Sequence, residues 1–410
     1  MSSGRTGLRV LMLTPGLPYP PEQGRSVRNY NLLRYLATRH RISLLSFAEP
    51  GTRPEHIEHL RCLCERVETL PTPRRSGADR LRTLFSSTWP DMAWRLASQE
   101  YAEALKRWLA AERFDVLQVE GIELARYLLA GDALGPHRPL IVFDNHNAEY
   151  LLQKRAFLTD LRTSSRWPAS LYSLVQWLRL RSFERRVCRA ADRVVAVSEA
   201  DARALRALDP TIRPAVVPNG VDLEHCRPGL PARTDLARPY LIFVGKMDFR
   251  PNVDAVLWFA ERVLPHLWSR RPDVRFCIVG QSPSRRLDVL RREPRITITG
   301  RVEDPRPYIA GADLYVVPLR VGGGTRLKVL EAMAMGQAIV STGLGVEGLG
   351  VTDGQHLLLA DDPRTFAARI LELLDDPDRR RTLGAAARAF VEERYGWESI
   401  GPLLEGVYRS

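Results

Sequence analysis

Short apolar runs rich in β-branched residues alternate along the chain with longer segments whose apolar residues recur at helical spacing. Runs that are apolar at every position are typical of parallel strands covered by helices on both faces of a sheet. In the first half of the chain, this pattern predicts strands at residues 8–14, 42–47, 66–70, 115–120, 140–144, 193–198 and 215–218. The helices expected between them include residues 26–39, 100–112 and 171–191.

The second half of the chain repeats the same alternation. Its expected strands are residues 240–245, 274–280, 296–300, 313–318, 338–342 and 357–359, and its expected helices include 253–269, 305–309, 326–335, 363–374 and 379–395. A stretch rich in Pro, Gly and Arg at 219–239 separates the two halves. The pattern therefore predicts an α/β protein of two doubly wound domains, residues 1–220 and 221–396. A last helix, 397–410, is expected to cross back to the first domain.

Residues 318–334 carry the most specific candidate chemistry. The triple glycine Gly322, Gly323 and Gly324 follows a strand, and Thr325 leads into a strong helix-forming segment. Glycine lets a backbone approach a ligand closely, and a helix N-terminus offers free N–H groups to an anion. Arg326 and Lys328 lie where the helix dipole disfavours cations, so their presence predicts a bound anion.

The carboxylate of Glu331, one turn into this helix, can accept hydrogen bonds from a ribose. Phosphate donors followed by one carboxylate indicate a nucleotide-diphosphate pocket. The alternative is a tight strand–helix turn with a surface pair between Lys328 and Glu331.

Composition places few further limits on function. A hydrophobic fraction of 45% and a charged fraction of 26% are ordinary for a globular protein. The five cysteines show no zinc-like spacing, which favours free thiols in the cytoplasm, and the N-terminus lacks the pattern of a signal peptide. The net charge of +12 comes almost wholly from arginine and is discounted as a nucleic-acid signal, so no nucleic-acid partner is expected.

Several motifs occur in an order that resembles the retaining glycosyltransferases of family four. They are VPNGVD at 217–222, FVGK at 243–246, IVG at 278–280, GRV at 300–302 and ADL at 312–314. Near the N-terminus, LTPGLPYPP at 13–21 and DNHNAEY at 144–150 resemble the exosortase-associated sugar transferases of that family. The resemblance covers nearly the whole chain. It implies a GT-B fold, with two Rossmann-like domains that face each other across a cleft.

The resemblance implies a nucleotide-diphosphate sugar as donor and no metal or other cofactor. Glu331 matches the second Glu of the family's paired motif and is implied to bind ribose, whereas Gly323 replaces the first Glu. Lys246 stands where the family has an Arg on the diphosphate, and Pro251 replaces the family's Lys. Further donor contacts are expected from the residues beside these motifs, namely Gly24, Gly245, Arg250, Val302, Gly322, Gly323, Gly324, Thr325 and Lys328.

In the first domain, His146 follows an expected strand end, where open α/β sheets place ligands. By resemblance it faces the donor sugar, and with Lys246 and Arg326 it makes up the expected catalytic set. A satisfied structural histidine is the alternative. Arg25 and Arg28, at the start of a helix, are expected to bind phosphate or the acceptor. Asn147 and Glu149 are expected to bind acceptor hydroxyls.

The resulting prediction is a cytoplasmic, retaining, metal-independent glycosyltransferase that acts on a glycan or a lipid-linked acceptor in bacterial polysaccharide biosynthesis. Arg- and Trp-bearing stretches at 74–108 and 155–193 also predict an anionic membrane surface as partner, at the inner face of the plasma membrane. Two alternatives stay open: a non-catalytic nucleotide-sugar-binding subunit and a GT-B-fold sugar-nucleotide epimerase. A dehydrogenase is disfavoured, because the GxGxxG at 343–348 does not open a helix.

Overall fold

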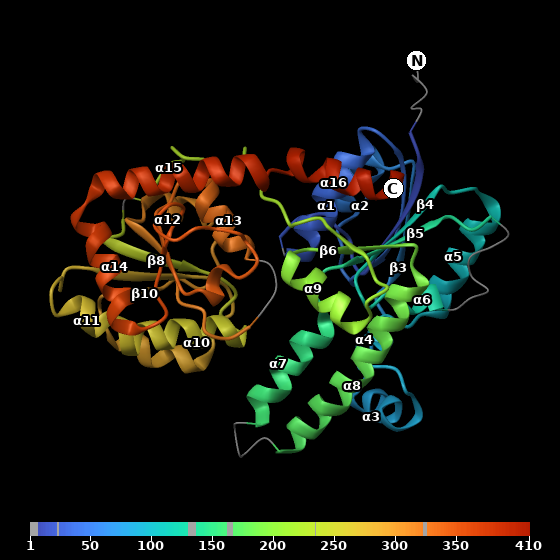
Figure 1. Cartoon of the computed structure of the whole chain (residues 1–410), viewed down its shortest axis with the longest axis horizontal. Helices are drawn as coiled ribbons and strands as arrows, with labels where there is room; N and C mark the ends of the chain where they lie inside the picture. Colours follow the sequence, from blue (N-terminus) through green and yellow to red (C-terminus); the bar gives the residue numbers. More distant parts are fainter. Residues whose placement is uncertain (1–6, 23, 130–136, 162–166, 234, 323–325) are drawn as a thin grey trace. The chain divides into compact units, whose positions relative to one another are not determined.

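The computed structural model describes residues 7–22, 24–129, 137–161, 167–233, 235–322 and 326–410. The chain folds into two units: residues 1–218 together with 400–410 form unit 1, and residues 219–399 form unit 2. Each unit is a parallel sheet wrapped by helices, which confirms the predicted class of two doubly wound α/β domains (Figure 1).

In its described part, unit 1 holds a seven-stranded parallel sheet in the order β3-β2-β1-β4-β5-β6-β7. Every strand predicted for this half has a counterpart. The strands are β1 (Arg9–Thr14), β2 (Arg41–Ala48), β3 (Arg66–Pro71), β4 (Val116–Glu120), β5 (Leu140–Asn145), β6 (Arg193–Ala196) and β7 (Pro214–Val216). The order reverses between β1 and β4, and an open α/β sheet binds its ligands beside such a point.

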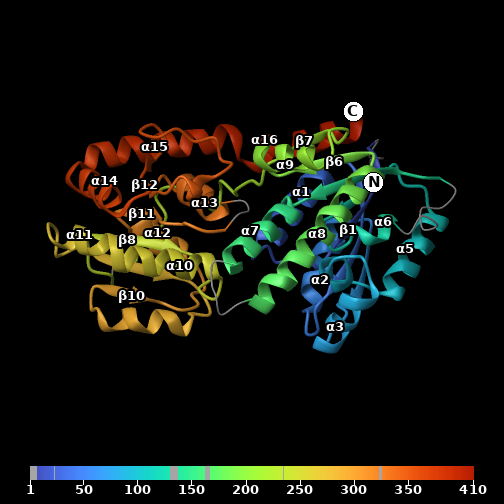
Figure 2. The same cartoon turned by 60° about the horizontal axis from the view of Figure 1, so that its bottom comes forward.

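Helices cover both faces of this sheet and fill its core with large aromatic residues. Trp108 and Tyr101 are fully buried, and Tyr101 stacks on Phe47 with ring centroids 4.4 Å apart. The helices are α1 (Gly24–Ala37), α2 (Pro54–Leu63), α3 (Gly77–Ser86), α4 (Asp91–Arg95), α5 (Gln99–Ala111), α6 (Arg126–Leu129), α7 (Glu149–Leu161), α8 (Trp167–Ala190) and α9 (Glu199–Leu208). Figures 1 and 2 show α7 and α8 side by side, projecting from the sheet.

The last helix, α16 (Trp397–Arg409), packs on unit 1 from Ile400 onward. Ile400 and Leu404 are fully buried there. A Cβ at Gly401 would lie 2.3 Å from the ring of Tyr35 on α1, so this close approach requires glycine. The sequence therefore docks the end of the chain against the first sheet.

In its described part, unit 2 holds a six-stranded parallel sheet in the order β10-β9-β8-β11-β12-β13. The strands, again matching those predicted, are β8 (Tyr240–Val244), β9 (Arg275–Val279), β10 (Ile296–Ile298), β11 (Leu314–Val317), β12 (Ile339–Ser341) and β13 (Leu358–Leu359). Its helical segments are α10 (Arg250–Trp258), η3 (Phe259–Val263), α11 (Leu264–Trp268), η4 (Arg285–Arg292), α12 (Arg306–Gly311), α13 (Leu327–Ala334), η5 (Leu344–Val346), α14 (Pro363–Asp375) and α15 (Pro377–Arg394).

One predicted helix of unit 2 is interrupted. The segment expected as a single helix over 253–269 widens into the π-helical turn η3 between α10 and α11. Pro265 explains the change, because proline has no N–H and its ring collides with the carbonyl four residues earlier.

Candidate functional site

The carboxyl edge of the unit 1 sheet gathers the predicted first-domain residues around a buried pair. His146 follows β5, and its Nε2 lies 2.7 Å from Oε2 of Glu120, the last residue of β4. The Glu120 side chain is fully buried and that of His146 is 13% exposed. The two residues meet because β4 and β5 pair in parallel, with Glu120 opposite Asp144. His146 is therefore held at one nitrogen by a carboxyl group that the sequence reasoning did not identify.

Arg28 lies under this pair rather than on the surface. Its Nε and Nη2 donate to Oδ2 of Asp144 at 3.0 and 2.8 Å, and its Nη1 donates to the Pro218 carbonyl. The side chain is 1% exposed. The structure thus differs from the expectation that Arg28 contacts an acceptor, because a buried Asp144 carboxylate already takes its guanidinium. Its role here is to hold the ends of α1 and β5 together.

Arg25, one turn earlier on α1, remains 47% exposed and pairs with Glu123 at 2.9 Å. Gly24, the first residue of α1, is exposed as well. Both lie at a helix N-terminus, so exposed N–H groups and one guanidinium remain accessible beside His146. The structure is compatible with the predicted anion or acceptor contact at Arg25, which stays a prediction.

Asn147 and Glu149 open helix α7 next to His146. The Asn147 amide donates to the Glu149 carboxyl at 3.1 Å, and both residues are half-buried. Glu184 of α8 accepts the backbone N–H groups of Glu149 and Tyr150 at 3.1 and 2.9 Å. The carboxyl group of Glu184 thereby caps α7, which fixes the predicted acceptor residues relative to the sheet.

Burial dominates the electrostatics of this edge. It raises the pKa of Glu120 to about 7, against the opposing pull of the nearby Arg28 guanidinium, and it lowers the pKa of His146 to about 4. Burial also raises the pKa of Glu149 to about 7. The imidazole is therefore neutral at physiological pH, while two carboxyl groups titrate close to it. Groups poised near neutrality are typical of functional sites.

Glu120, Asp144 and His146 also offer ligand atoms within 4.8 Å of one another, a spacing compatible with a metal ion. Their surroundings fit a cation poorly. Arg28 places two donor nitrogens on the Asp144 carboxylate, and Glu120 already contacts His146. A positive guanidinium at this distance opposes the binding of a second positive charge. The trio is better described as an internal network than as a metal centre.

In unit 2, the loops after β8 and β11 meet at the carboxyl edge of the sheet, and glycine makes the contact possible. A Cβ at Gly245 would lie 2.7 Å from the Asn252 amide nitrogen and 2.8 Å from Nζ of Lys328. A Cβ at Gly280 would lie 1.7 Å from the Gly245 carbonyl oxygen. Both glycines are therefore required by space, and they let Lys328 approach the end of β8.

Lys328, at the start of α13, donates to Asn252 Oδ1 at 2.7 Å and lies 4.5 Å from the centroid of the Phe243 ring. Burial lowers its pKa to about 7, helped by the neighbouring Arg326. Glu331, one turn on, is half-buried, and burial raises its pKa to about 7. The lysine is thus held by an amide at the loop junction, which corrects the alternative of a simple surface pair with Glu331.

The other predicted cations have different degrees of exposure. Arg326 precedes α13, is 6% exposed and donates to the Leu344 carbonyl at 2.8 Å. The side chain of Lys246 is 53% exposed, with its Nζ 3.6 Å from Asp248. Arg250 begins α10 and is exposed. Lys246 and Arg250 are exposed, and their contact with the diphosphate stays a prediction, whereas Arg326 would have to act from a buried position.

Two of the remaining donor residues can be placed. Val302, after β10, is half-buried, and Gly322 adopts a positive φ of 108°, a conformation that favours glycine. The expected contacts at Gly323, Gly324 and Thr325 lie outside the described residues.

The acidic pair Asp361 and Asp362 of unit 2 accepts hydrogen bonds from the backbone. Asp362 caps α14 by accepting from the Arg364 and Thr365 backbone, and Asp361 accepts from the Gly343 backbone. The GxGxxG segment that contains Gly343 forms the short turn η5 and no longer helix. It therefore lacks the helix N-terminus of a dinucleotide fingerprint.

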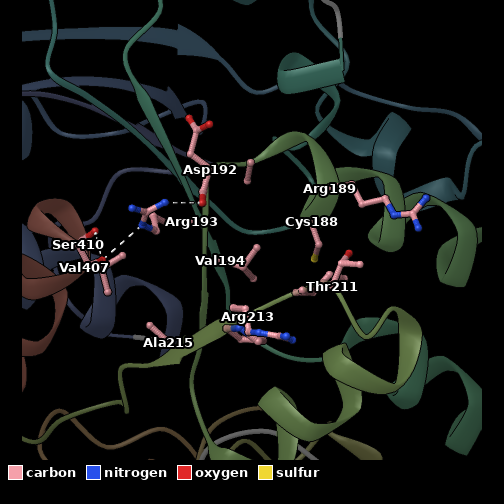
Figure 3. Close-up of a pocket in the computed structure, with 13 residues that line it drawn as sticks. Cys188, Arg189, Asp192, Arg193, Val194, Thr211, Arg213, Ala215, Val407 and Ser410 are labelled. Atoms are coloured by element: carbon pink, nitrogen blue, oxygen red, sulfur yellow. Dashed lines mark hydrogen bonds between the residues drawn. The ribbon is translucent and has the colours of Figure 1, made fainter.

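A separate cavity of about 590 Å³ lies in unit 1, at the beginning of β6 and β7. Figure 3 shows Arg189, Arg193 and Arg213 around it. These side chains have internal partners: Arg189 pairs with Asp209, Arg193 bonds to Ser410 and the Asp192 carbonyl, and Arg213 bonds to the Pro210 carbonyl. The cavity lies at the opposite edge of the sheet from His146, because the strands are parallel.

The sequence reasoning missed two residues that organise these sites, Glu120 and Asn252. Glu120 had a usable signal, since a charged residue that ends a mostly apolar strand and precedes a glycine is unusual. Asn252 had no signal for its contact with Lys328, which lies 76 positions away in the sequence.

Two family models match the chain, each within one half. The model described as Glycosyltransferase Family 4 matches residues 23–225, and the model described as Glycosyl transferases group 1 matches residues 238–376. Together they cover the loops described above in both units.

Curated relatives agree with these models. A GDP-mannose-dependent monoacylated alpha-(1-6)-phosphatidylinositol monomannoside mannosyltransferase of Corynebacterium glutamicum is 30% identical over 218 residues, covering 47% of this chain. The match spans little more than half of that relative, 55% of its length. The alpha-maltose-1-phosphate synthase of Mycolicibacterium smegmatis is 30% identical over 267 residues, which cover 58% of this chain and 67% of the synthase.

Among solved structures, the sucrose-phosphate synthase of Thermosynechococcus elongatus superposes with a TM-score of 0.72 at 19% identity. The superposition covers 98% of each chain. This likeness supports the fold alone and confirms the GT-B architecture.

Proposed function

Because the chain belongs to the GT-B glycosyltransferases, we propose that it is a retaining, metal-independent hexosyltransferase. It takes a sugar from a nucleotide-diphosphate donor and transfers it to a glycan or lipid-linked acceptor in bacterial polysaccharide biosynthesis. The work of the enzyme would be done in the cytoplasm, where such donors are made. The resemblance of the motifs to the family is what supports retention of the anomeric configuration and a reaction without a metal.

The observation that supports the donor most directly is the junction of the two unit 2 loops. Lys328 bonds to Asn252 where Gly245 leaves no room for a side chain, and α13 begins there. A cation at a glycine-lined helix start is a preorganised site for diphosphate. Lys246 and Arg326 would supply positive charge that stabilises the negative charge developing on the leaving diphosphate. Glu331 would bind the ribose, and Gly245, Arg250, Val302 and Gly322–Gly324 with Thr325 would line the donor.

On the unit 1 side, His146 would face the donor sugar, with Gly24 and Arg25 beside the phosphates. Asn147 and Glu149 would bind acceptor hydroxyls. Glu149 suits a hydroxyl because burial raises its pKa to about 7, so it can act as donor or acceptor near neutrality. Arg28 would contribute through Asp144 rather than by contact with substrate.

The test is a donor screen followed by a turnover assay. Thermal shifts over nucleoside diphosphates and their sugars identify the base and the sugar, and nucleotide release is then measured with and without candidate acceptors. Acceptor-dependent nucleotide release supports transfer. Donor binding without release would favour the non-catalytic binding subunit, and conversion of one nucleotide sugar into another would favour the epimerase.

We also propose that unit 1 docks on an anionic membrane surface through α3, α7 and α8. These three helices carry most of the large apolar side chains that the described residues expose, including Phe85 at 82%, Leu171 at 65%, Leu81 at 58% and Leu178 at 52%. Leu81 and Phe85 lie one turn apart on α3, a helix with no buried residue. None of the described helices is long and apolar enough to cross a bilayer, so contact would be peripheral.

Charge supports the same partner. Arg80 and Arg82 on α3 and Arg181 and Arg186 on α8 are exposed, and the described side chains of α8 include one acid, Glu184, which is buried. Arg179 instead bonds to the Leu84 carbonyl, which ties α8 to α3, and Arg185 pairs with Asp209. Apolar side chains flanked by arginines fit a surface of anionic lipid.

A further inference from the structure

A chain of buried side-chain hydrogen bonds runs from the last helix to His146. The Tyr408 hydroxyl of α16 donates to Oε1 of Gln118 at 3.1 Å, and the Gln118 amide donates to Oε1 of Glu120 at 2.8 Å. The other oxygen of Glu120 lies 2.7 Å from Nε2 of His146. Gln118 and Glu120 are fully buried, and Tyr408 is 7% exposed. The chain therefore joins residue 408 to a predicted site residue without passing through solvent.

The chemistry of each link gives the chain a direction. Because Tyr408 donates to the carbonyl oxygen of Gln118, the amide nitrogen of Gln118 must face Glu120. Oε1 of Glu120 then accepts a hydrogen bond and is not the place for a proton. A proton shared by Glu120 and His146 then lies between Oε2 and Nε2, and the Asn29 amide also donates to Oε2 at 2.9 Å.

We propose that Tyr408, Gln118 and Glu120 act as positioning residues that set which ring nitrogen of His146 carries the proton. When Oε2 is protonated, its O–H donates to Nε2 and the ring holds its hydrogen at Nδ1. When Glu120 is ionised, Nε2–H donates to the carboxylate and Nδ1 presents a lone pair. Ionisation of Glu120 thus turns Nδ1 from a donor into an acceptor, while the imidazole stays neutral throughout.

The free nitrogen, Nδ1, lies toward the turn after β4. A Cβ at Gly121 would lie 3.5 Å from it, and Gly121 has a positive φ of 85°. The role of Nδ1 in catalysis rests on the function proposed above, in which His146 would present Nδ1 to a substrate hydroxyl. Glu120 would then decide whether that hydroxyl meets a donor or an acceptor.

The surrounding charges place the exchange near neutral pH. Burial raises the pKa of Glu120 to about 7, while Arg28 and Arg25 of α1 oppose that rise. Burial lowers the pKa of His146 to about 4, opposed by Asp144 of β5 and by Glu123. Burial, helped by the nearby Glu123 carboxylate, raises the pKa of Glu149 of α7 to about 7.

Nitrogen-15 NMR of histidine-labelled, full-length protein without substrate tests the proposal, because the two ring nitrogens report the tautomer directly. His146→Gln identifies the resonances of His146. In the wild type we expect the proton to move from Nδ1 to Nε2 as the pH rises through about 7. In Glu120→Gln, the amide oxygen would accept from Gln118 and the amide nitrogen would donate to Nε2. We therefore expect the ring to stay protonated at Nδ1 at every pH.

Tyr408→Phe provides a milder variant that removes one hydroxyl from the end of the chain. It should displace the pH midpoint of the exchange, whereas Tyr395→Phe, which removes a buried hydroxyl bonded to the Leu349 carbonyl in unit 2, should leave it unchanged. Thermal unfolding confirms that each variant is folded. A His146 tautomer that is the same in wild type and Glu120→Gln across the pH range would overturn the proposal.

This readout needs no turnover, so it is independent of the proposed function. A tautomer exchange in a protein without transferase activity would reject the function and keep the chain of positioning residues. If the enzyme is active, we expect kcat of the wild type to change with pH near 7. Glu120→Gln should remove this pH dependence while the KM for the donor stays unchanged.

Discussion

The carboxyl edge of the unit 1 sheet and the glycine loops of unit 2 occupy the same position in two similar folds, yet they are built in opposite ways. Unit 1 gathers the carboxyl groups of Glu120, Asp144 and Glu123 and neutralises them with Arg28 and Arg25. Apart from Arg25, which is 47% exposed, these side chains are buried and bonded to one another. Little of their charge is left over for a ligand.

Unit 2 removes side chains instead. Gly245 and Gly280 leave space that no Cβ could share, and the freed room brings Lys328 beside Asn252. Lys246 at this edge is 53% exposed, with its Nζ 3.6 Å from Asp248. The difference indicates that the cation-rich, glycine-lined edge of unit 2 is suited to bind an anion. The edge of unit 1, whose side chains bond to one another, is suited to orient His146. The following experiments test that contrast.

Removal of the unit 2 cations should have the largest effect. If Lys246 and Arg326 stabilise the leaving diphosphate, Lys246→Ala and Arg326→Ala should each lower kcat by about 100- to 1000-fold, since preorganised charge acts mostly on the transition state. Nucleoside binding should change far less. The matched control is Arg381→Ala, a largely exposed arginine of α15. Near wild-type turnover of the double variant, or a strict need for added magnesium, would contradict the assignment.

Removal of Glu331 should have an intermediate effect, on the donor alone. Loss of one charged hydrogen-bonding group costs roughly 1.5–3 kcal/mol, or about 10- to 150-fold in affinity. Glu331→Ala should therefore weaken nucleotide binding by calorimetry, while Glu393→Ala, 72% exposed on α15, should not. Unchanged affinity of the Glu331 variant would remove this residue from the site.

Loss of the apolar residues of α3 should reduce membrane attachment without touching either site. Phe85→Ser with Leu81→Ser should lower binding to anionic vesicles by at least about tenfold, because burial of even one such side chain contributes roughly 1.5–3 kcal/mol when complete. Val289→Ser, 56% exposed in unit 2, is the control. Sedimentation with anionic and neutral vesicles measures the effect. Wild-type protein that ignores anionic vesicles at low salt would rule out this partner.

The smallest expected effect is on the stability of the protein, through the buried carboxyl group of Glu120 in unit 1. Burial raises the pKa of Glu120 to about 7, so folding favours its protonated form. This contribution to stability is complete below the usual carboxyl range and is lost as the pH rises to about 7. Relative to Glu120→Gln, the wild-type free energy of unfolding should therefore fall by about 1 kcal/mol between pH 6 and pH 8. Denaturant unfolding at both pH values checks this, with Glu393→Gln as control. A difference that rises with pH would contradict it.

The helices and strands could be predicted from the sequence, because apolar runs and helical spacing are local properties. It predicted the strands of both sheets and the two-domain class. It also located the glycine loop before α13, where residue type alone indicates chemistry. Its one broken helix followed from Pro265, a local signal that was overlooked.

Contacts between side chains, by contrast, became known only from the three-dimensional fold. Arg28 could be recognised as a cation at a helix start, but its burial against Asp144 depends on a strand more than a hundred positions away. Lys328 was expected to interact with Glu331 or with phosphate, and the fold gave it Asn252 as a partner. The chain from Tyr408 to His146 exists because α16 packs on the first sheet. Hydrogen bonds and burial depend on distance in space, and periodicity along the chain does not carry that information.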